Sequence, residues 1–176
     1  MKPLFFDVDT QVDFLRPSGA LYVPGAEGIV PAVAALNRWA AAHSIPLIST
    51  VDCHAENDPE FQVWPPHCVG GTLGQRKPAE TMVGQIVLNK TTLDCFKQPE
   101  LPGLLSDTGA ERCVVYGVVA EICVRLAAFG LLKTGRRVEI VTDAVKELRA
   151  GDAARMFGEF TAAGGVLTTV AQATAR

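Results

Sequence analysis

The alternation of strand and helix is clearest in residues 112–133, which read RCVVYGVVAEICVRLAAFGLLK. The first seven of these residues form a nearly uninterrupted apolar run rich in β-branched side chains, which is typical of a buried strand. Apolar side chains then recur at helical spacing over residues 121–133, and Gly135 follows where a glycine commonly ends a helix. This part of the chain therefore predicts one buried strand followed directly by a helix.

The same pattern continues along the chain in both directions. Short apolar runs predict six strands, at Pro3–Asp9, Pro46–Val51, Gln85–Lys90, Arg112–Val118, Arg137–Thr142 and Gly165–Val170. Helical spacing predicts helices at Gly28–His43, Glu121–Lys133 and Asp152–Ala163. Because the strands are continuously apolar, they suit a parallel sheet covered on both faces through right-handed crossovers. We therefore expect an α/β fold, a three-layer αβα sandwich around a six-stranded parallel sheet with the strand order 3-2-1-4-5-6.

Length and composition limit the class of protein. At roughly 100–200 residues per domain, 176 residues predict a single domain over residues 1–176. The chain has 16 Lys and Arg against 19 Asp and Glu, a formal net charge of −3, and this argues against a nucleic-acid partner because such binders are usually basic. The longest nearly apolar run, residues 113–120, is far shorter than the ~20 residues of a membrane-spanning helix, so we expect no membrane partner.

Cysteine content and the N-terminal residues bear on the cellular compartment. The five cysteines are an odd number, and the N-terminal apolar run is interrupted at Asp7, too early for the core of a signal peptide. Free thiols without a secretory signal are typical of a reducing compartment. We therefore predict a soluble, cytoplasmic protein with reduced cysteines. The sequence leaves open whether the chain forms a homo-oligomer.

Three reactive side chains stand at or just after the ends of predicted strands: Asp9, Lys90 and Cys123. Cys123 begins a helix, whose N-terminal N–H groups and dipole lower the pKa of a thiol and stabilise an oxyanion. Asp9 could then act as the general base for that thiol, and Lys90 could hold the thiolate. The alternative is that Cys123 is a buried structural cysteine, Asp9 a turn-forming acid and Lys90 a solvated lysine.

A second group of candidate residues lies in the long segment Asp52–Met82, whose length in a compact domain favours a functional loop. Asp52 and His54 are two residues apart and so share one side of an extended chain, with Glu60 and His67 later in the same segment. Two imidazoles with carboxylates suit Zn, Fe(II), Mn or Co. Spacing alone leaves two alternatives open: no metal at all, and a structural zinc site of Cys53, His54, His67 and Cys68.

Two aromatic side chains, Phe14 and Trp64, stand close in sequence to these candidate residues. A ring-shaped substrate could stack against them, because aromatic rings attract one another at their faces and edges. The alternative is plain packing in the hydrophobic core, and the sequence alone does not separate the two interpretations.

Five segments together resemble one superfamily of enzymes. They are Asp9–Phe14 (DTQVDF), Asp52–His54 (DCH), Trp64–Thr72 (WPPHCVGGT), Lys90 and Gly117–Val124 (GVVAEICV). In this order, and spread over nearly the whole chain, they are similar to the motifs of the cysteine hydrolase superfamily that includes nicotinamidases and isochorismatase-like proteins. The resemblance implies the isochorismatase-like hydrolase fold, which agrees with the αβα sandwich expected above.

The resemblance also implies catalytic roles. Cys123 would be the nucleophile, Asp9 the base and acid, and Lys90 the electrostatic partner of both. The resemblance further implies a cis peptide bond between Val118 and Val119. The amide of Val119, together with that of Cys123, would then form the oxyanion hole.

Roles in binding follow from the same resemblance. Asp52, His54 and His67 are implied as ligands of one divalent metal ion, with Glu60 as a further ligand. Zinc is the expected ion, with iron, manganese or cobalt as alternatives. Phe14 and Trp64 would sandwich the ring of the substrate.

The sequence is most similar to the nicotinamidase branch, because both the cysteine triad and the metal ligands are present. Isochorismatase-type members lack the cysteine, and carbamoyl-amide hydrolases lack the metal set. The resemblance thus implies a metal-dependent cysteine amidohydrolase that converts nicotinamide, a small-molecule amide, to nicotinate and ammonia through a thioester. The alternatives are a cysteine amidase acting on another small amide or carbamoyl compound, and a catalytically silent metal- or ligand-binding module.

Two stretches depart from the usual pattern of this superfamily. Ala120-Glu121-Ile122 stands where Thr-Asp-Tyr is more usual before the cysteine, and Leu93 stands where an aromatic residue is expected. Both departures lie outside the triad, so we expect them to change the shape of the pocket and the ring that it prefers.

Overall fold

Six strands form one parallel sheet in the computed structural model, which describes residues 1–175. They are β1 (Pro3–Val8), β2 (Leu47–Asp52), β3 (Ile86–Lys90), β4 (Arg112–Val118), β5 (Arg137–Lys146) and β6 (Val166–Thr168). Every pairing between neighbouring strands of this sheet is parallel, and the strand order is β3-β2-β1-β4-β5-β6. The predicted parallel sheet and its strand order are therefore confirmed.

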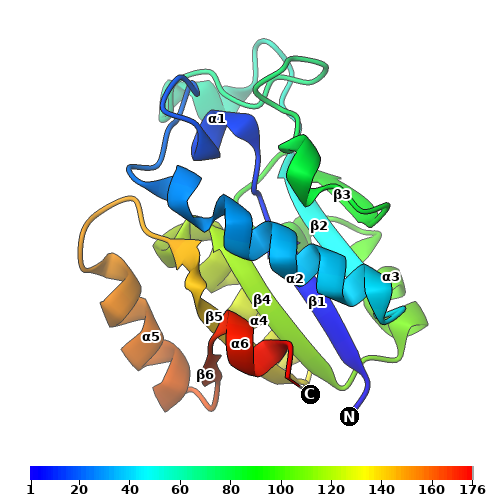
Figure 1. Ribbon diagram of the computed structural model, residues 1–176. Coiled ribbons are helices and arrows are strands. Elements are labelled where there is room, and N and C mark those ends of the chain that lie inside the picture. Colours follow the sequence, from blue (N-terminus) through cyan, green and yellow to red (C-terminus); the bar gives the residue numbers. More distant parts are fainter. Residues whose placement is uncertain (176) are drawn as a thin grey trace.

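Helices cover both faces of the sheet (Figure 1). Helix α2 (Val30–Ala42) packs on β1 and β2 and contacts α6 (Val170–Ala173). On the other face, α4 (Arg125–Lys133) packs on β4 and β5 and contacts α5 (Asp152–Ala162). The remaining α-helices of the described chain are α1 (Val12–Leu15) and α3 (Leu101–Thr108). The result is the three-layer αβα sandwich that the alternating pattern predicts.

The central strands are buried because helices lie on both of their faces. All residues of β4 are buried, and so are all residues of β1 after Pro3. Full burial of a Val, Leu or Phe side chain contributes roughly 1.5–3 kcal/mol each, so this pair of strands forms the rigid centre of the fold. The sequence shows the same property as runs of apolar residues without alternation.

Two strands, β5 and β6, differ from the sequence prediction by more than one residue at an end. Strand β5 continues past Thr142 to Lys146, because a bulge shifts its register against β4 and lets it pair as far as Val118. Strand β6 is only three residues long, since Thr169 leaves the sheet and its hydroxyl caps α6. Pattern reasoning locates strand centres better than strand ends, where pairing and capping decide.

The helices also begin differently from the prediction. The segment before α4 is a π-helical turn, Ala120–Val124, and the segment before α2 is a 3-10 turn, Ala26–Ile29. The sequence does not predict α3, whose eight residues include Pro102 and Gly103. Proline and glycine disfavour a helix interior and so obscure the helical pattern of a short segment.

The long segment between β2 and β3 folds over the carboxyl ends of the strands (Figure 1). It contains two 3-10 turns, Pro59–Gln62 and Ala79–Thr81. Lys77 Nζ in this segment lies 2.8 Å from Asp7 Oδ2 in β1, and both side chains are buried. A buried, paired charge of this kind ties the segment to the sheet, because separating the two groups leaves a charge without a partner.

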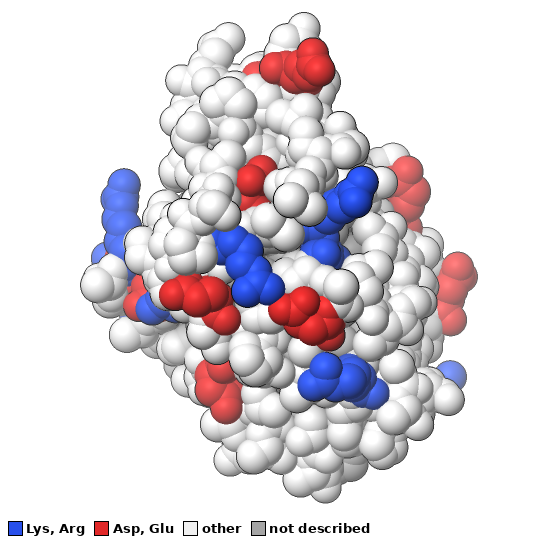
Figure 2. Space-filling model, turned by 45° about the horizontal axis from the view of Figure 1, so that its top comes forward, with Lys and Arg blue, Asp and Glu red and all other residues white. Residues whose placement is uncertain are grey.

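The face that carries these loops has acidic and basic side chains interspersed (Figure 2). Among residues 1–175, no helix has the length and apolar character needed to cross a bilayer.

Candidate active site

The candidate catalytic residues meet where four neighbouring strands end. Asp9 follows β1, Asp52 and Lys90 are paired at the ends of β2 and β3, and Cys123 lies in the π-helical turn after β4. Carboxyl ends of parallel strands face the same edge of a sheet, and the sheet order brings β1 next to both β2 and β4. Side chains that are 33 to 114 positions apart in the sequence are thus brought into one cluster.

Lys90 is the centre of this cluster. Its Nζ lies 2.9 Å from Asp9 Oδ2 and 3.8 Å from Cys123 Sγ, and it donates a hydrogen bond to Asp52 Oδ1. Thr50 Oγ1 donates a 2.7 Å hydrogen bond to Asp9 Oδ1, which fixes the orientation of that carboxylate. The interpretation of Lys90 as a solvated surface residue is therefore wrong, because the residue is only 1% exposed.

Burial and charge set the protonation states here. Burial by itself lowers the pKa of Lys90, but the nearby charges of Asp9, Cys123 and Asp52 raise that pKa well above its usual value, so the side chain stays an ammonium. Burial raises the pKa of the Cys123 thiol, although Lys90 opposes this effect. The resting thiol is consequently protonated, and it needs a neighbouring base before it can act as a nucleophile.

The segment Asp9–Phe14 holds several parts of the site at once. Gln11 accepts a 2.7 Å hydrogen bond from the Asp52 backbone N–H and donates a 2.8 Å bond to the Asp52 carbonyl. Asp13 Oδ2 accepts a 2.7 Å bond from the N–H of Cys68, the residue after His67. The acid–Gln–acid pattern therefore positions the loop that carries the candidate metal ligands, while Asp9 itself faces Lys90.

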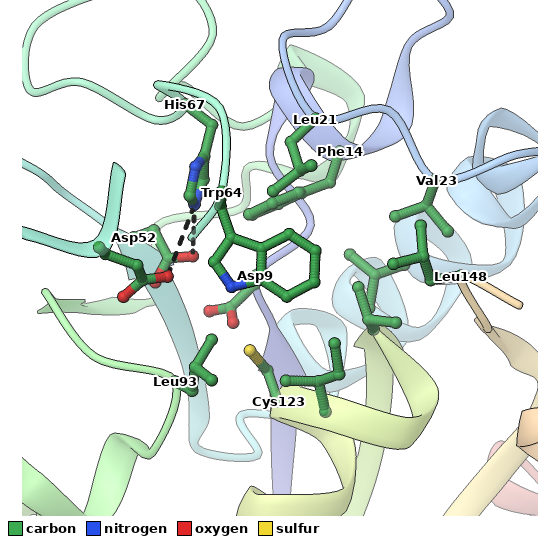
Figure 3. A pocket seen from close by; sticks show the side chains of 14 residues that line it. Asp9, Phe14, Leu21, Val23, Asp52, Trp64, His67, Leu93, Cys123 and Leu148 are labelled. Atoms are coloured by element: carbon green, nitrogen blue, oxygen red, sulfur yellow. Dashed lines mark ion pairs between the residues drawn. The ribbon is translucent and has the colours of Figure 1, made fainter. Parts of the chain in front are cut away.

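Asp52, His54 and His67 bring one potential ligand atom each within 4.8 Å of one another, and all three are buried. His67 Nε2 lies 4.0 Å from Asp52 Oδ2 and 3.9 Å from Glu60 Oε1 (dashed lines in Figure 3). Glu60 thus lies beside this group without belonging to its closest set. Neither Cys53 nor Cys68 is part of a close ligand group within residues 1–175, so the four-ligand arrangement with both cysteines does not form.

The two imidazoles are held in the way that metal-binding histidines usually are. Asp58 Oδ2 lies 3.0 Å from His54 Nδ1, and the Pro65 carbonyl lies 2.8 Å from His67 Nδ1. Burial lowers the pKa of His67, which favours the neutral form that binds a metal. His54 Nε2 is buried and has no hydrogen-bond partner among the described residues. An orphaned nitrogen beside a carboxylate and a second imidazole is the donor set that a zinc-like cation requires.

Both candidate groups open into one pocket of about 420 Å³, part of it continuous with solvent (Figure 3). Phe14 and Trp64 line it together with Asp9, His67 and Cys123. Cys123 is buried but still lines this pocket, so the residue is not sealed within the core. Apolar residues from elsewhere in the chain complete the wall: Leu21, Val23, Leu93, Val118, Val119, Ile122 and Leu148.

The peptide bond between Val118 and Val119 is cis, in agreement with the resemblance. The Val119 carbonyl accepts hydrogen bonds from the N–H groups of Ile122 and Val124, each 3.1 Å long, and so is directed into the π-helical turn. Val119 itself lines the pocket beside Cys123. The predicted pair of oxyanion donors therefore lies at the pocket wall.

Sequence reasoning missed several residues of the site. Thr50 and Asp58 act on a catalytic or ligand side chain, and their polar type alone gives no signal of this. Leu148 lines the pocket from the connection between β5 and α5, 25 positions after Cys123. No local pattern reports such a contact, because the path of that connection decides it.

Comparisons with known proteins agree with this geometry. The model of the isochorismatase domain family matches residues 3–172. Streptothricin hydrolase from Streptomyces noursei is 33% identical over 138 residues, which is 78% of this chain but only 51% of that protein, so the chain spans about half of its length. Nicotinamidase from Acinetobacter baylyi is 25% identical over 175 residues, covering 80% of this chain and 79% of that protein.

A solved structure is similar over nearly the whole chain. The pyrazinamidase of Pyrococcus horikoshii in complex with zinc has a TM-score of 0.90 and 30% sequence identity, covering 96% of this chain and 99% of that one. The sheet order, the cysteine-containing pocket and the family match over residues 3–172 lead to the same conclusion. The chain belongs to the isochorismatase family of hydrolases.

Proposed function

We propose that this protein is a metal-dependent cysteine amidohydrolase that converts nicotinamide and water to nicotinate and ammonia. The observation that carries the proposal is that members of two groups line one pocket: Asp9 and Cys123 from the first, and Asp52 and His67 from the second. Lys90 pairs with Asp9 and Asp52, and His54 lies close to Asp52 and His67, so both stand directly next to these lining residues. The similarity to a nicotinamidase and to a zinc-bound pyrazinamidase supports the same reaction class.

Asp9 and Cys123 perform the chemical steps. Asp9 takes the proton of the Cys123 thiol, and the thiolate attacks the carboxamide carbon of the substrate. Asp9 then gives its proton to the departing ammonia, which breaks the C–N bond and leaves a thioester on Cys123. Asp9 next takes a proton from water, and the hydroxide attacks the thioester and displaces the sulfur as a thiolate. Asp9 returns its proton to the sulfur, and the product acid gives its own proton to water and leaves as nicotinate.

Lys90 and two backbone amides stabilise the charges that these steps create. The Lys90 ammonium lies between the carboxylate and the sulfur, so it stabilises whichever of the two is negatively charged. The amides of Val119 and Cys123 are proposed to hold the oxyanion, a contribution of roughly 3–4 kcal/mol per donor in hydrolases of other folds.

Asp52, His54 and His67 are proposed to hold one divalent ion, with Glu60 as a further ligand. Zinc is expected, with iron, manganese or cobalt as alternatives that the same N and O ligands accept. When bound, this ion supplies a Lewis acid for the ring nitrogen of a pyridine. The chain itself supplies Phe14 and Trp64, whose rings line the same pocket and stack on the substrate.

The charge of the pocket favours a neutral ring over an anionic substrate. Its lining contains the acids Asp9, Asp52 and Glu60 and, among the described residues, no arginine or lysine. A carbamoyl amino acid would bring into this pocket a carboxylate that finds no arginine or lysine in the lining, and the proposed metal ion would then have to pair with that carboxylate instead of a ring nitrogen. A cysteine amidase acting on another small amide or carbamoyl compound is the second candidate, since the chain is also similar to a hydrolase with a different named substrate, streptothricin hydrolase.

The test is ammonia release from nicotinamide by the zinc-loaded protein and by Cys123→Ala. We expect turnover by the wild-type protein and a loss of roughly 10⁴-fold or more in the variant, as when other catalytic nucleophiles are removed. Cys113→Ala is the matched control, because Cys113 is a buried cysteine in β4 that does not line the pocket. If the folded, zinc-loaded protein releases no ammonia from nicotinamide, the assignment of nicotinamide as the substrate is refuted.

Removal of the metal separates this proposal from the catalytically silent binding module. A chelator should abolish turnover, and added zinc should restore it. Iodoacetamide should alkylate Cys123 near neutral pH, because Asp9 can take the proton of the thiol and the Lys90 ammonium, 3.8 Å from the sulfur, stabilises the thiolate that forms. A silent module predicts a thiol that does not react under these conditions.

A further inference from the structure

One side chain beside the nucleophile has a contact that the reaction above does not use. Glu121 lies in the π-helical turn, two residues before Cys123. Its carboxylate accepts hydrogen bonds from the backbone N–H of Leu148, at 3.1 Å to Oε1 and 3.3 Å to Oε2, and from that of Arg149, at 3.2 Å to Oε1. These two N–H groups belong to the connection between β5 and α5, 27 and 28 positions further along the chain.

This contact joins two parts of the pocket wall. Ile122 and Cys123 line the pocket from the turn that contains Glu121, and Leu148 lines it from the connection that Glu121 holds. Within the described chain, no other side chain is hydrogen-bonded to the backbone of residues 147–151. The position of Leu148 therefore depends on Glu121 more than on any other side-chain hydrogen bond.

Leu148 lies across the pocket from the candidate metal ligands. In Figure 3, Val23 and Leu148 stand on one side and His67 and Asp52 on the other, with Cys123 between them. Suppose that the ring nitrogen of nicotinamide is held at the metal group and the carboxamide, on C3, at Cys123. The ring edge between these two positions then faces those groups, and C5, the carbon farthest from that edge, faces Leu148. An apolar side chain there leaves little room for a substituent on that carbon.

We propose that Glu121 is a positioning residue that holds Leu148 as the wall against the far edge of the substrate ring. This wall restricts the substrate to small, uncharged aromatic amides that carry no substituent at the position facing it. The inference rests on the proposed amidase function for the identity of the ring, whereas the contact between Glu121 and the backbone at 148–149 does not.

The first experiment tests the contact without using activity. Amide hydrogen exchange at Leu148 and Arg149 is compared between the wild-type protein, Glu121→Ala and Glu121→Gln. Loss of both bonds to a charged acceptor should speed exchange roughly tenfold or more in Glu121→Ala. Glu121→Gln, which keeps a carbonyl acceptor, should show a smaller change. Glu147→Ala is the control. Glu147 lies in the same connection but pairs with Lys146 at the end of β5, so this substitution should leave exchange at both amides unchanged.

The second experiment tests the effect on substrate preference. Glu121→Ala should raise the KM for nicotinamide about tenfold while kcat changes less, because the triad is untouched and the wall is displaced. Leu148→Ala should raise kcat/KM for 5-methylnicotinamide relative to nicotinamide about tenfold, the usual weight of one methyl group in a pocket. Glu147→Ala should leave both substrates as in the wild-type protein.

A third measurement keeps the wall testable if nicotinamide proves not to be the substrate. Iodoacetanilide carries a phenyl ring, and its rate of reaction with Cys123 relative to iodoacetamide should rise in Leu148→Ala and Glu121→Ala. Unchanged exchange at Leu148 and Arg149 in Glu121→Ala overturns the positioning role. If Leu148→Ala changes neither the preference between 5-methylnicotinamide and nicotinamide nor that between iodoacetanilide and iodoacetamide, the proposal that Leu148 limits the size of the ring is refuted. If only nicotinamide turnover is absent, the proposed function is refuted, and the hydrogen-exchange and alkylation measurements still decide the roles of Glu121 and Leu148.

Discussion

Nζ of Lys90 lies 2.9 Å from Oδ2 of Asp9, and each of the two side chains is 1% exposed. A lysine and an aspartate so deeply buried are stable only as a pair, because either charge alone would be strongly unfavourable in the core. The two residues come from β3 and from the end of β1, with β2 between them in the sheet. This pair places a carboxylate and an ammonium beside Cys123, which are the groups that the proposed mechanism uses.

Asp9→Asn should remove the base and keep the shape of the site. The asparagine can still accept the hydrogen bond that Thr50 donates, and Lys90 keeps the Asp52 carboxylate as a charged partner, so the fold should survive. We expect kcat/KM for the amide substrate to fall roughly 10²–10⁴-fold, the usual contribution of a general base. Steady-state kinetics measure the loss, and circular dichroism and zinc content serve as controls. Activity within a few-fold of the wild-type protein would contradict the role of Asp9.

Asp58→Ala should weaken metal binding although Asp58 is not a proposed ligand. Its carboxylate holds Nδ1 of His54, and loss of such a partner typically costs 10–100-fold in metal affinity. Asp94→Ala is a matched control, because Asp58 and Asp94 each cap a 3-10 turn with a 2.9 Å bond from the N–H two residues on. Competition with a chelating dye measures both affinities. Equal affinities in the two variants would contradict the role of Asp58.

Glu139→Gln should destabilise the fold in a pH-dependent way. Although burial opposes the effect, hydrogen bonds from Arg112 and Arg137 lower the pKa of Glu139 to about 2. A lowered carboxyl pKa stabilises the folded state above the unfolded pKa of about 4.3, and the stabilisation is lost as the pH falls toward 2. We expect the variant to lose roughly 1–3 kcal/mol at pH 7, and the difference from the wild-type protein to shrink between pH 4.5 and about pH 2.

Urea unfolding at several pH values measures this difference. Glu159→Gln is the control, because Glu159 pairs with Arg125 at the surface, where an ion pair contributes about 0–1 kcal/mol. A difference between Glu139→Gln and the wild-type protein that stays constant down to pH 2 would show that the Glu139 charge does not contribute.

Gly117→Ala should destabilise the fold strongly. Gly117 has a φ of +123°, and an added Cβ would lie 2.0 Å from the Val8 carbonyl oxygen in the neighbouring strand. Because β1 and β4 cannot separate without opening the core, we expect a loss of about 3 kcal/mol or more. Gly103→Ala is the control: its Cβ meets nothing within 4 Å, and alanine should stabilise α3 by up to about 1 kcal/mol. Thermal unfolding of both variants distinguishes the two outcomes.

The sequence by itself determined the architecture and the identities of the reactive side chains. Apolar runs without alternation require burial on both faces, and helical spacing between them requires helices on both sides of a parallel sheet. Asp9, Lys90 and Cys123 follow from that pattern, because each ends a predicted strand or directly follows one. Asp52, His54 and His67 follow from ligand type and spacing together with the resemblance.

Only the tertiary structure decided how these residues are supported. Thr50 orients Asp9 from 41 positions away, and Glu121 holds the backbone at Leu148 from 27 positions away. Such contacts depend on strand register and on the path of a connection, which long-range packing sets and no local pattern encodes. The chemistry of a side chain can be read from its type, whereas its partners are known only when the chain is folded.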